Sequence, residues 1–523
     1  MAQLLHYEKQ RLLLQKELDH LKTKTERNRL GQFATPTLLA REILEYGTRL
    51  LPANEPIRFL DPAIGTGSFY SALLETAAAD RLAEAAGFEI DRHFGEPTKS
   101  LWSHTPLTIH INDFTSAEPP KTEETKYNLL ICNPPYVRHH HLSGNQKMRL
   151  QYHVEQACGI RLDGLSGLYC YFMGISHAWM KTGGVAGWLV PSEFMDVNYG
   201  KALKYYLLNQ VNLLRIHRFD PNDVQFRDAL VSSAVVWFRK EKPPLDNNIE
   251  FTFGGSLAKP AMSRLVTAKT LQYEKKWTRF PLRDAREPAN RLTLSALFNI
   301  KRGLATGDNK FFILTREQIS RHRLPMKFLT PILPSPRYLP LDEIPADAEG
   351  NPSIDRRLFL LDCDLPEERL KIEYPTLWKY YENGKPEVSG RYLCRTRTPW
   401  YSQEKRPPSP FICTYMGRGD IKRNRPFRFI LNHSKATVAN VYLLLYPKPF
   451  LANELLRDPE LARRIWLLLN SIPLNTLFDE GRIYGGGLHK MEPGELANLP
   501  ADFLLEFIPE AMRSVPKQLK LFN

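Results

Sequence analysis

Short apolar runs alternate with helical stretches along residues 29–240. The runs lie at 57–60, 87–90, 107–111, 127–132, 185–190, 213–219 and 231–238, and helical spacing is found at 68–86, 168–181 and 199–210. Strand and helix alternating at this spacing predict a mainly parallel sheet that is covered on both faces. The expected fold class is therefore α/β, a doubly wound Rossmann-like domain built by right-handed crossovers.

The segments on either side of this region differ from it. Leucines recur at helical spacing over residues 3–28, which predicts a helix packed on the domain that follows. Residues 241–290 contain EKPPLDNN and a Gly-Gly pair and predict little regular structure. We therefore expect an N-terminal helix, a first domain, a linker and a mixed α+β second domain, with boundaries at 1–28, 29–245, 246–290 and 291–523.

Composition narrows the class of protein. The chain has 523 residues, of which 43% are hydrophobic and 24% are charged, as in an ordinary folded protein. The net charge of +14 favours a polyanionic partner. Six cysteines without a CxxC pair predict reduced thiols in a cytosol, and no uncharged run is long enough for a membrane span. We expect a soluble cytoplasmic protein with no membrane partner.

Four polar features follow predicted strands in order. They are DPAIGTG at 61–67, FEID at 88–91, NDF at 112–114 and NPPY at 133–136, and Asp61, Glu89, Asp113 and Asn133 are 28, 24 and 20 residues apart. Each interval fits one strand and one helix, so all four should meet at the carboxyl edge of the sheet, where doubly wound domains bind ligands. Singly, each could be a helix cap or a turn.

These motifs in this order resemble the adenine-N6 DNA methyltransferases. GQFATP at 31–36 is similar to the cofactor motif of that family, and its position upstream of the glycine loop is the gamma-class, TaqI-like order. KRGLATG at 301–307 and YGGGLHK at 484–490 resemble the TaqI-like C-terminal specificity domain. NPPY alone is shared with enzymes that methylate RNA or protein glutamine, so those substrates stay open, as does a non-catalytic DNA-binding module.

The resemblance implies S-adenosylmethionine as the cofactor, with no metal. Glu89 would accept hydrogen bonds from the ribose, and Asp113 would bind the adenine amino group. The other residues implied around the cofactor are Thr35, Asp61, Pro62, Ala63, Gly65, Gly67, Ile90 and Phe114.

The resemblance also implies the catalytic residues. The Asn133 side-chain oxygen and the Pro134 carbonyl would each accept one hydrogen of a flipped adenine amine, with Pro135 in the same turn. Tyr136 and Phe226 would be the aromatic walls around the base.

Double-stranded DNA is the expected partner. The side chains with suitable chemistry for DNA contact are Arg138, His139, His140, Arg397, Trp400, Arg418, Arg423, His489 and Lys490. Adjacent histidines do not converge on one ion, which argues against a metal at 139–141. We expect a monomer from a prokaryotic restriction–modification system whose cognate endonuclease is a separate protein.

Overall fold

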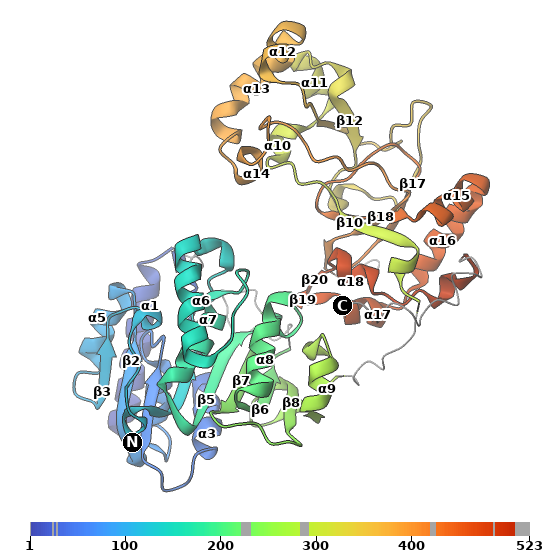
Figure 1. Ribbon diagram of the computed structural model, residues 1–523. Coiled ribbons are helices and arrows are strands. Elements are labelled where there is room, and N and C mark those ends of the chain that lie inside the picture. The colour runs from blue at the N-terminus through green and yellow to red at the C-terminus, as the bar shows by residue number, and fades with distance from the viewer. Residues whose placement is uncertain are drawn as a thin grey trace. The chain divides into compact units, whose positions relative to one another are not determined.

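The structure is a computed structural model (Figure 1) that describes residues 2–23, 26–27, 30–220, 232–282, 292–418, 425–484 and 487–507. The chain divides into two compact units. The N-terminal unit comprises residues 1–287 with 484–486, and the C-terminal unit comprises the remaining residues.

A nine-stranded sheet forms the centre of the N-terminal unit. The first five strands in its order are parallel, and β7 is antiparallel to both of its neighbours. The strand order is β3 (Leu107–His110), β2 (Leu82–Phe88), β1 (Ile57–Asp61), β4 (Tyr127–Cys132), β5 (Met180–Pro191), β7 (Ser233–Arg239), β6 (Asn212–Arg218), β8 (Asn248–Gly255) and β9 (Pro260–Thr267). The predicted α/β class with a mainly parallel sheet is confirmed.

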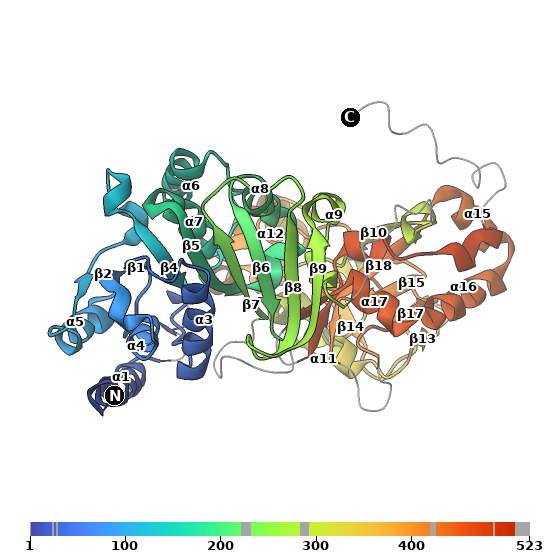
Figure 2. The ribbon, with the colours of Figure 1, turned by 90° about the horizontal axis from the view of Figure 1, so that it is seen from below.

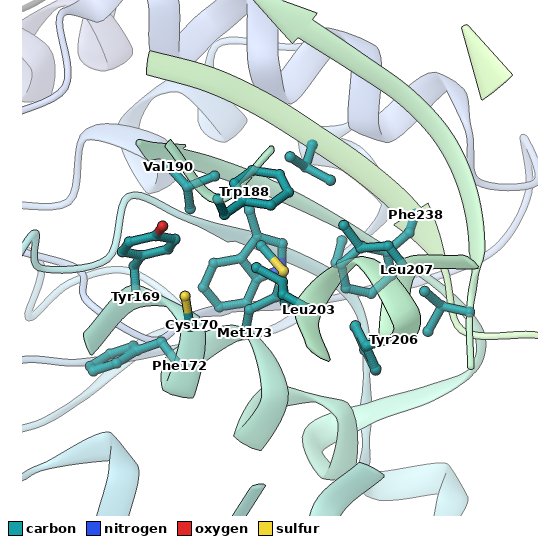
Figure 3. Packing of buried hydrophobic residues seen from close by; sticks show 14 of the residues in the cluster. Tyr169, Cys170, Phe172, Met173, Trp188, Val190, Leu203, Tyr206, Leu207 and Phe238 are labelled. Atoms are coloured by element: carbon teal, nitrogen blue, oxygen red, sulfur yellow. The ribbon is translucent and has the colours of Figure 1, made fainter. Parts of the chain in front are cut away.

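Helices cover both faces of this sheet (Figure 2). One face packs against α6 (Gly144–Cys158), α7 (Leu168–Ser176) and α8 (Lys201–Asn209), and the other packs against α3 (Thr37–Arg49) and α4 (Ser68–Leu74). In the first of these cores Trp188 of β5 lies among Met173 of α7 and Leu203 and Leu207 of α8 (Figure 3). The cores hold the strand ends in fixed positions relative to one another.

Two further α-helices belong to the N-terminal unit. These are α1 (Ala2–His20) and α5 (Arg92–Leu101), and α1 contacts both α4 and α5. The expected N-terminal helix is therefore present, but it ends at His20 instead of residue 28.

Two expectations about local structure were wrong. The helix expected over 68–86 ends at Leu74, because Ala85 and Ala86 are buried in the sheet as part of β2 in spite of their helical propensity. The segment expected to lack regular structure contains β8, β9 and α9 (Ala268–Tyr273). Ile249 and Phe251 alternate with polar residues and are buried, which is the strand signal that the prolines nearby obscured.

The C-terminal unit is mixed α+β. Its five-stranded sheet has the order β10 (Phe298–Arg302), β18 (Tyr442–Pro447), β15 (Phe411–Thr414), β17 (Phe429–Asn432) and β13 (Glu343–Ile344). Two three-stranded sheets have the orders β11 (Ile313–Leu314), β14 (Leu358–Leu361), β12 (Leu329–Ile332) and β16 (Met416–Gly417), β20 (Leu488–Lys490), β19 (Arg482–Tyr484).

The α-helices among the described residues of this unit are 4 to 14 residues long. They are α10 (Asn309–Phe312), α11 (Arg316–His322), α12 (Glu367–Glu373), α13 (Pro375–Val388), α14 (Tyr392–Arg395), α15 (Pro449–Arg457), α16 (Pro459–Ser471), α17 (Leu474–Glu480) and α18 (Pro493–Ala497).

All six cysteines are buried and unpaired, including Cys132 within β4. Across the described part of the chain, no helix is both long enough and apolar enough to cross a lipid bilayer.

Candidate active site

A cavity of about 860 Å³ opens at the carboxyl edge of the parallel strands. Asp61, Glu89, Asp113 and Asn133, which follow or end four different strands, all line it. The four motifs that the sequence places 20 to 28 residues apart therefore meet in one place. The volume suits a cofactor-sized ligand, which commonly occupies 300 to about 1,000 Å³.

The glycine loop after β1 is held by two side chains of the α5 region. Thr98 donates a hydrogen bond from its hydroxyl to the Gly65 carbonyl at 3.0 Å, and Trp102 Nε1 donates to the Thr66 carbonyl at 3.0 Å. Gly67 has a φ of +89°, and a Cβ there would lie 2.7 Å from Trp102 Nε1. The loop thus adopts its shape because residue 67 has no side chain.

Glu89 bridges the glycine loop and the end of β2. Its carboxylate accepts hydrogen bonds from the backbone N–H groups of Gly65 at 3.2 Å and Asp91 at 2.8 Å. Burial raises the pKa of Glu89 to about 7, and the negative charge of Asp91 adds to the effect. Ile90 is mostly exposed and lies at the cavity wall beside it.

Asp61 is the second buried carboxyl group at the cavity. It is 1% exposed and accepts a hydrogen bond from the Ala63 N–H at 3.1 Å. Burial raises its pKa to about 8, and the nearby Glu89 carboxylate contributes. Pro62 and Ala63 also line the cavity. Two carboxyl groups that lose their protons near neutral pH suit a ligand that carries positive charge and hydroxyl donors.

We expect cofactor binding to strengthen as pH rises. Glu89 has a folded pKa of about 7 against an ordinary 4.5, so the folded protein holds an extra proton between these values. The contribution of Glu89 to the stability of the free protein is therefore lost as pH rises through 7. A ligand that needs the Glu89 carboxylate gains affinity over the same interval. The dissociation constant of S-adenosylmethionine should fall about tenfold between pH 6 and pH 8. Calorimetry at both values measures it.

Glu89→Gln is the control for this pH dependence. The amide cannot release a proton, so we expect weak binding that lacks the pH step of Glu89 near 7 and keeps only the dependence that Asp61 gives near 8. Equal wild-type affinity at pH 6 and pH 8 would contradict the assignment.

Asp113 and Phe114 form the wall beyond β3. The Asp113 carboxylate accepts hydrogen bonds from the backbone N–H and hydroxyl of Thr115, at 2.9 and 2.7 Å, and lies 3.3 Å from Arg149 of α6. Phe114 is 1% exposed and packs against the Phe172 ring with centroids 5.5 Å apart. A carboxylate beside an aromatic side chain suits the binding of a ligand that has a planar ring with an amino group.

The side chain of Asn133 has a fixed orientation. Its Nδ2 donates to the Phe33 carbonyl at 3.0 Å and to the Thr35 hydroxyl at 3.1 Å. Because both N–H donors are directed into the GQFATP segment, Oδ1 is the atom left to accept a hydrogen from a ligand. The amide is oriented before any ligand arrives.

The remainder of the NPPY turn packs on the same segment. The Tyr136 N–H donates to the Gly31 carbonyl at 3.4 Å, and the Tyr136 hydroxyl donates to the Leu189 carbonyl at 3.1 Å. The Tyr136 ring lies 5.9 Å from the Phe33 ring. Pro134 is buried and Pro135 lines the cavity. Phe226, the second predicted aromatic wall, lies outside the described residues.

The basic residues after NPPY lie at the surface. Arg138 and His140 are exposed, and His139 begins a short 3-10 helix with its neighbours. Burial lowers the pKa of His139 and of His140, and the other cations of this loop contribute at His140. His141, which the sequence analysis considered only as part of a histidine run, lines the cavity.

Two predicted DNA contacts in the C-terminal unit have structural roles in the fold. Trp400 is 9% exposed and packs among aromatic side chains, including Tyr401 with ring centroids 5.6 Å apart. Arg397 donates to the carbonyl groups of Ala305 at 2.6 Å and Thr306 at 2.8 Å. The sequence pattern RTPWY resembles a DNA-contact surface because it mixes cations and aromatics. In the structure Trp400 is buried, whereas Arg397 is partly exposed and bonded to backbone carbonyls.

We expect Trp400→Ala to destabilise the C-terminal unit. Removing a core tryptophan leaves a cavity, so the free energy of unfolding should fall by about 3–5 kcal/mol. Denaturant unfolding followed by circular dichroism measures the change. An unfolding transition like that of the wild type, together with weakened DNA binding, would show that Trp400 contacts DNA after all.

The other predicted contacts are spread over this unit. Arg418 is exposed, and Arg423 lies outside the described residues. The His489 ring stacks on Phe478 with centroids 4.5 Å apart, and Lys490 forms an ion pair with Glu492 at 2.7 Å.

The sequence interpretation missed part of the cavity wall. Gln15, Asp19 and Lys22 line the cavity from the N-terminal helix and the residues just after it. A signal was present, because Glu8, Arg11, Gln15, Asp19 and Lys22 recur every three or four residues and so form a polar stripe on one face. The exposed charges around it hid this stripe.

Two known protein families match separate parts of the chain. Residues 72–225 match the family described as Eco57I restriction-modification methylase, and residues 274–520 match the family described as Type II methyltransferase M.Eco57I, C-terminal domain. Over these two stretches the chain is similar to Eco57I-like type II restriction-modification methyltransferases. It is a restriction-modification methyltransferase, and its methyl donor is S-adenosylmethionine.

Two relatives match nearly the whole chain. The type II methyltransferase M.XamI of Xanthomonas campestris pv. amaranthicola is 28% identical over 490 residues, which are 90% of this chain and 85% of the relative. The type II methyltransferase M.AccI of Acinetobacter calcoaceticus is 24% identical over 486 residues, again 90% and 85%. Among solved structures, the type IIL restriction-modification enzyme MmeI in complex with DNA has a TM-score of 0.49 at 13% identity, over 87% of this chain and 63% of that one.

Proposed function

We propose that this methyltransferase transfers a methyl group to the N6 amine of adenine in duplex DNA at a specific site. The observation that carries the proposal is the orientation of Asn133, whose Nδ2 is bound by Phe33 and Thr35 so that Oδ1 can accept a hydrogen from an amine. The order of GQFATP, the glycine loop and NPPY supports assignment to the gamma class, which has the TaqI-like order.

Methyl transfer to adenine N6 requires the enzyme to activate the amine. The lone pair of adenine N6 is delocalised into the ring, so the amine is a poor nucleophile. Asn133 Oδ1 and the Pro134 carbonyl each accept one N6 hydrogen, which holds the amine and favours pyramidalisation toward the methyl donor. Positioning and oriented dipoles then supply most of the acceleration. When bound, S-adenosylmethionine supplies an electrophilic methyl group.

The cofactor fits the residues of the cavity. Glu89 would accept hydrogen bonds from the ribose hydroxyls, Asp113 would accept one from the adenine amino group, and Phe114 and Ile90 would lie against the adenine ring. Thr35 and the loop from Asp61 to Gly67 would surround the methionine part. The raised pKa values of Asp61 and Glu89 support this assignment, because a cationic ligand with hydroxyl donors favours their charged forms.

The target adenine is buried in a duplex, so the enzyme flips it out of the stack. Tyr136 and Phe226 stack on the flipped base in this proposal. Residues 29–245 form the catalytic domain, and residues 291–523 form the target-recognition domain, with Arg138, His139, His140, Arg418, Arg423, His489 and Lys490 as the proposed DNA contacts. The net charge of +14 supports a DNA partner.

The biological role that we propose is protection of host DNA. The protein acts as a monomer in the cytoplasm of a prokaryote, and a separate endonuclease recognises the same site. Similarity over 90% of the chain to two type II methyltransferases supports this role.

Product analysis tests the proposed reaction. The protein is incubated with tritiated S-adenosylmethionine and mixed plasmid DNA, and the DNA is digested to nucleosides. We expect the label in N6-methyladenine, with no label in parallel RNA or peptide acceptors. Label only in cytosine, or only in RNA, would refute the proposal. Single-molecule sequencing of the methylated DNA then gives the target site.

A further inference from the structure

The N-terminal helix α1 contains a buried ion pair that lies beside the cofactor cavity. Arg11 is 1% exposed and Glu8 is 8% exposed. Arg11 Nε and Nη2 donate to the two carboxylate oxygens of Glu8 at 2.7 and 2.6 Å. A buried bidentate pair of this kind is costly to desolvate, so it persists only where further hydrogen bonds satisfy both partners.

Those further hydrogen bonds lead to the glycine loop. Arg11 Nη1 donates to the hydroxyl oxygens of Ser68 at 3.0 Å and Thr66 at 3.3 Å. Glu8 accepts the hydroxyl hydrogen of Ser71 at 2.6 Å. Since Thr66 lies between the two glycines of the loop and Ser68 begins α4, the pair fixes both ends of the turn that the loop makes into the helix.

The same pair reaches the segment that orients Asn133. Glu8 accepts the hydroxyl hydrogen of Thr37 at 2.6 Å, and Arg11 Nη2 lies 3.3 Å from the same hydroxyl. Thr37 is the first residue of α3 and follows Thr35 and Pro36 directly. One buried pair therefore joins α1, the glycine loop and the GQFATP segment.

The surroundings of Glu8 favour its charged, carboxylate form. Burial alone would raise its pKa, but hydrogen bonds from Arg11, Ser71 and Thr37 outweigh it, and the pKa lies below the ordinary value. The network is therefore charged at neutral pH and has little freedom to rearrange.

α1 also contacts the cavity directly. Thr66 donates its hydroxyl hydrogen to Gln15 Oε1 at 2.7 Å, and Gln15 lines the cavity. Just beyond α1, Lys22 bonds to Asp91, which also accepts from Gln32 Nε2 at 2.8 Å. The helix is thus attached at the glycine loop and again at the end of β2.

We propose that Arg11 is a positioning residue for S-adenosylmethionine, which with Glu8 holds the glycine loop and the GQFATP segment in the geometry that binds the cofactor. Arg11 is not among the residues that line the cavity, so it acts through Thr66, Ser68 and Thr37. The proposal rests on the assignment of this cavity to the cofactor. A displacement of about 1 Å at such a loop can cost about a hundredfold in function.

The test compares Arg11→Met with the double variant Glu8→Gln/Arg11→Met. Arg11→Met leaves a buried carboxylate without its counter-charge, so we expect a lower Tm. We also expect the dissociation constant for S-adenosylmethionine, measured by calorimetry without DNA, to rise about tenfold or more. The kcat at saturating cofactor and the KM for DNA should change less than about threefold, because Glu8 keeps its bond to Thr37 and so still holds the segment that orients Asn133.

The double variant separates positioning from stability. It removes both charges, so its Tm should return toward the wild-type value, while cofactor affinity stays weak because the loop still lacks its donors. Lys9→Met on the exposed face of α1 is the matched control and should behave as wild type in both measurements.

Binding of adenosine, a fragment of the cofactor, shows which part of the cofactor the Arg11 substitution affects. The glycine loop lies under the proposed methionine part, so Arg11→Met should weaken S-adenosylmethionine more than adenosine. Wild-type affinity in Arg11→Met would overturn the proposal, as would affinity that recovers together with Tm in the double variant. Because binding is measured without DNA, a failure of the adenine assignment leaves this result unaffected.

Discussion

Asn133→Ala is expected to lower kcat by about a thousandfold while S-adenosylmethionine still binds within about threefold of wild type. Loss of one oriented polar group at a reacting centre typically costs a hundredfold to a thousandfold. The amide oxygen here also holds the amine in place, so the effect lies at the upper end. Single-turnover methylation of a mapped DNA site measures the rate, and calorimetry measures cofactor binding.

The structure explains why the two effects separate. Asn133 contacts the cofactor side of the cavity through its Nδ2 bonds to Phe33 and Thr35, and the backbone that carries Thr35 is held independently at Thr37 by Glu8. Asn133→Ala therefore removes the hydrogen-bond acceptor for the adenine amine but disturbs cofactor binding little. Asn209→Ala, on the surface of α8, is the matched control and should leave both quantities unchanged. Wild-type turnover by Asn133→Ala would remove Asn133 from the mechanism.

Gly31→Ala is expected to lower kcat/KM by about a hundredfold or more, through a clash between two backbone segments. Gly31 has a φ of +66°, and a Cβ there would lie 2.3 Å from the backbone nitrogen of Tyr136 and 2.9 Å from the carbonyl carbon of Pro135. Neither atom belongs to a flexible side chain, so the GQFATP segment and the NPPY turn must move apart. Asn133 then loses the partners that orient its amide.

Steady-state kinetics with DNA and cofactor varied in turn measure this loss. Gly164→Ala provides the control, because that residue has an ordinary φ and open space where its Cβ would lie. We expect wild-type kinetics from the control and a folded but slow enzyme from Gly31→Ala. Retention of full activity by Gly31→Ala would mean that the close contact between the two segments is not needed for transfer.

The sequence predicted most of the parallel strands well, but it did not predict β8 and β9. Continuous apolar runs such as the one at 127–132 identify buried parallel strands, because both faces of such a strand are covered. β2 was harder to recognise, since its alanines favour a helix and only burial between β1 and β3 makes them a strand. β8 follows a proline-rich stretch that is typical of a linker, and its apolar alternation is short.

The candidate site was predictable where chemistry and spacing coincide. Asp61, Glu89, Asp113 and Asn133 line one cavity as their intervals predicted, because one strand and one helix return the chain to the same edge each time. Arg397 and Trp400 were predicted as DNA contacts, but the same residue types serve equally well as a carbonyl donor and a core aromatic, as these two do in the structure. Composition alone cannot distinguish an inward side chain from an outward one.

The sequence by itself determined the class of fold, the order of the motifs and the residues that line the edge of the sheet, since these depend on local pattern and on fixed repeat lengths. Only the tertiary structure decided which way Asn133 points and that α1 lines the same cavity. Both depend on hydrogen bonds between segments far apart in the chain, such as Glu8 with Ser71 and Asn133 with Phe33. Contacts of that kind have no period in the sequence, so they become visible only when the chain has folded.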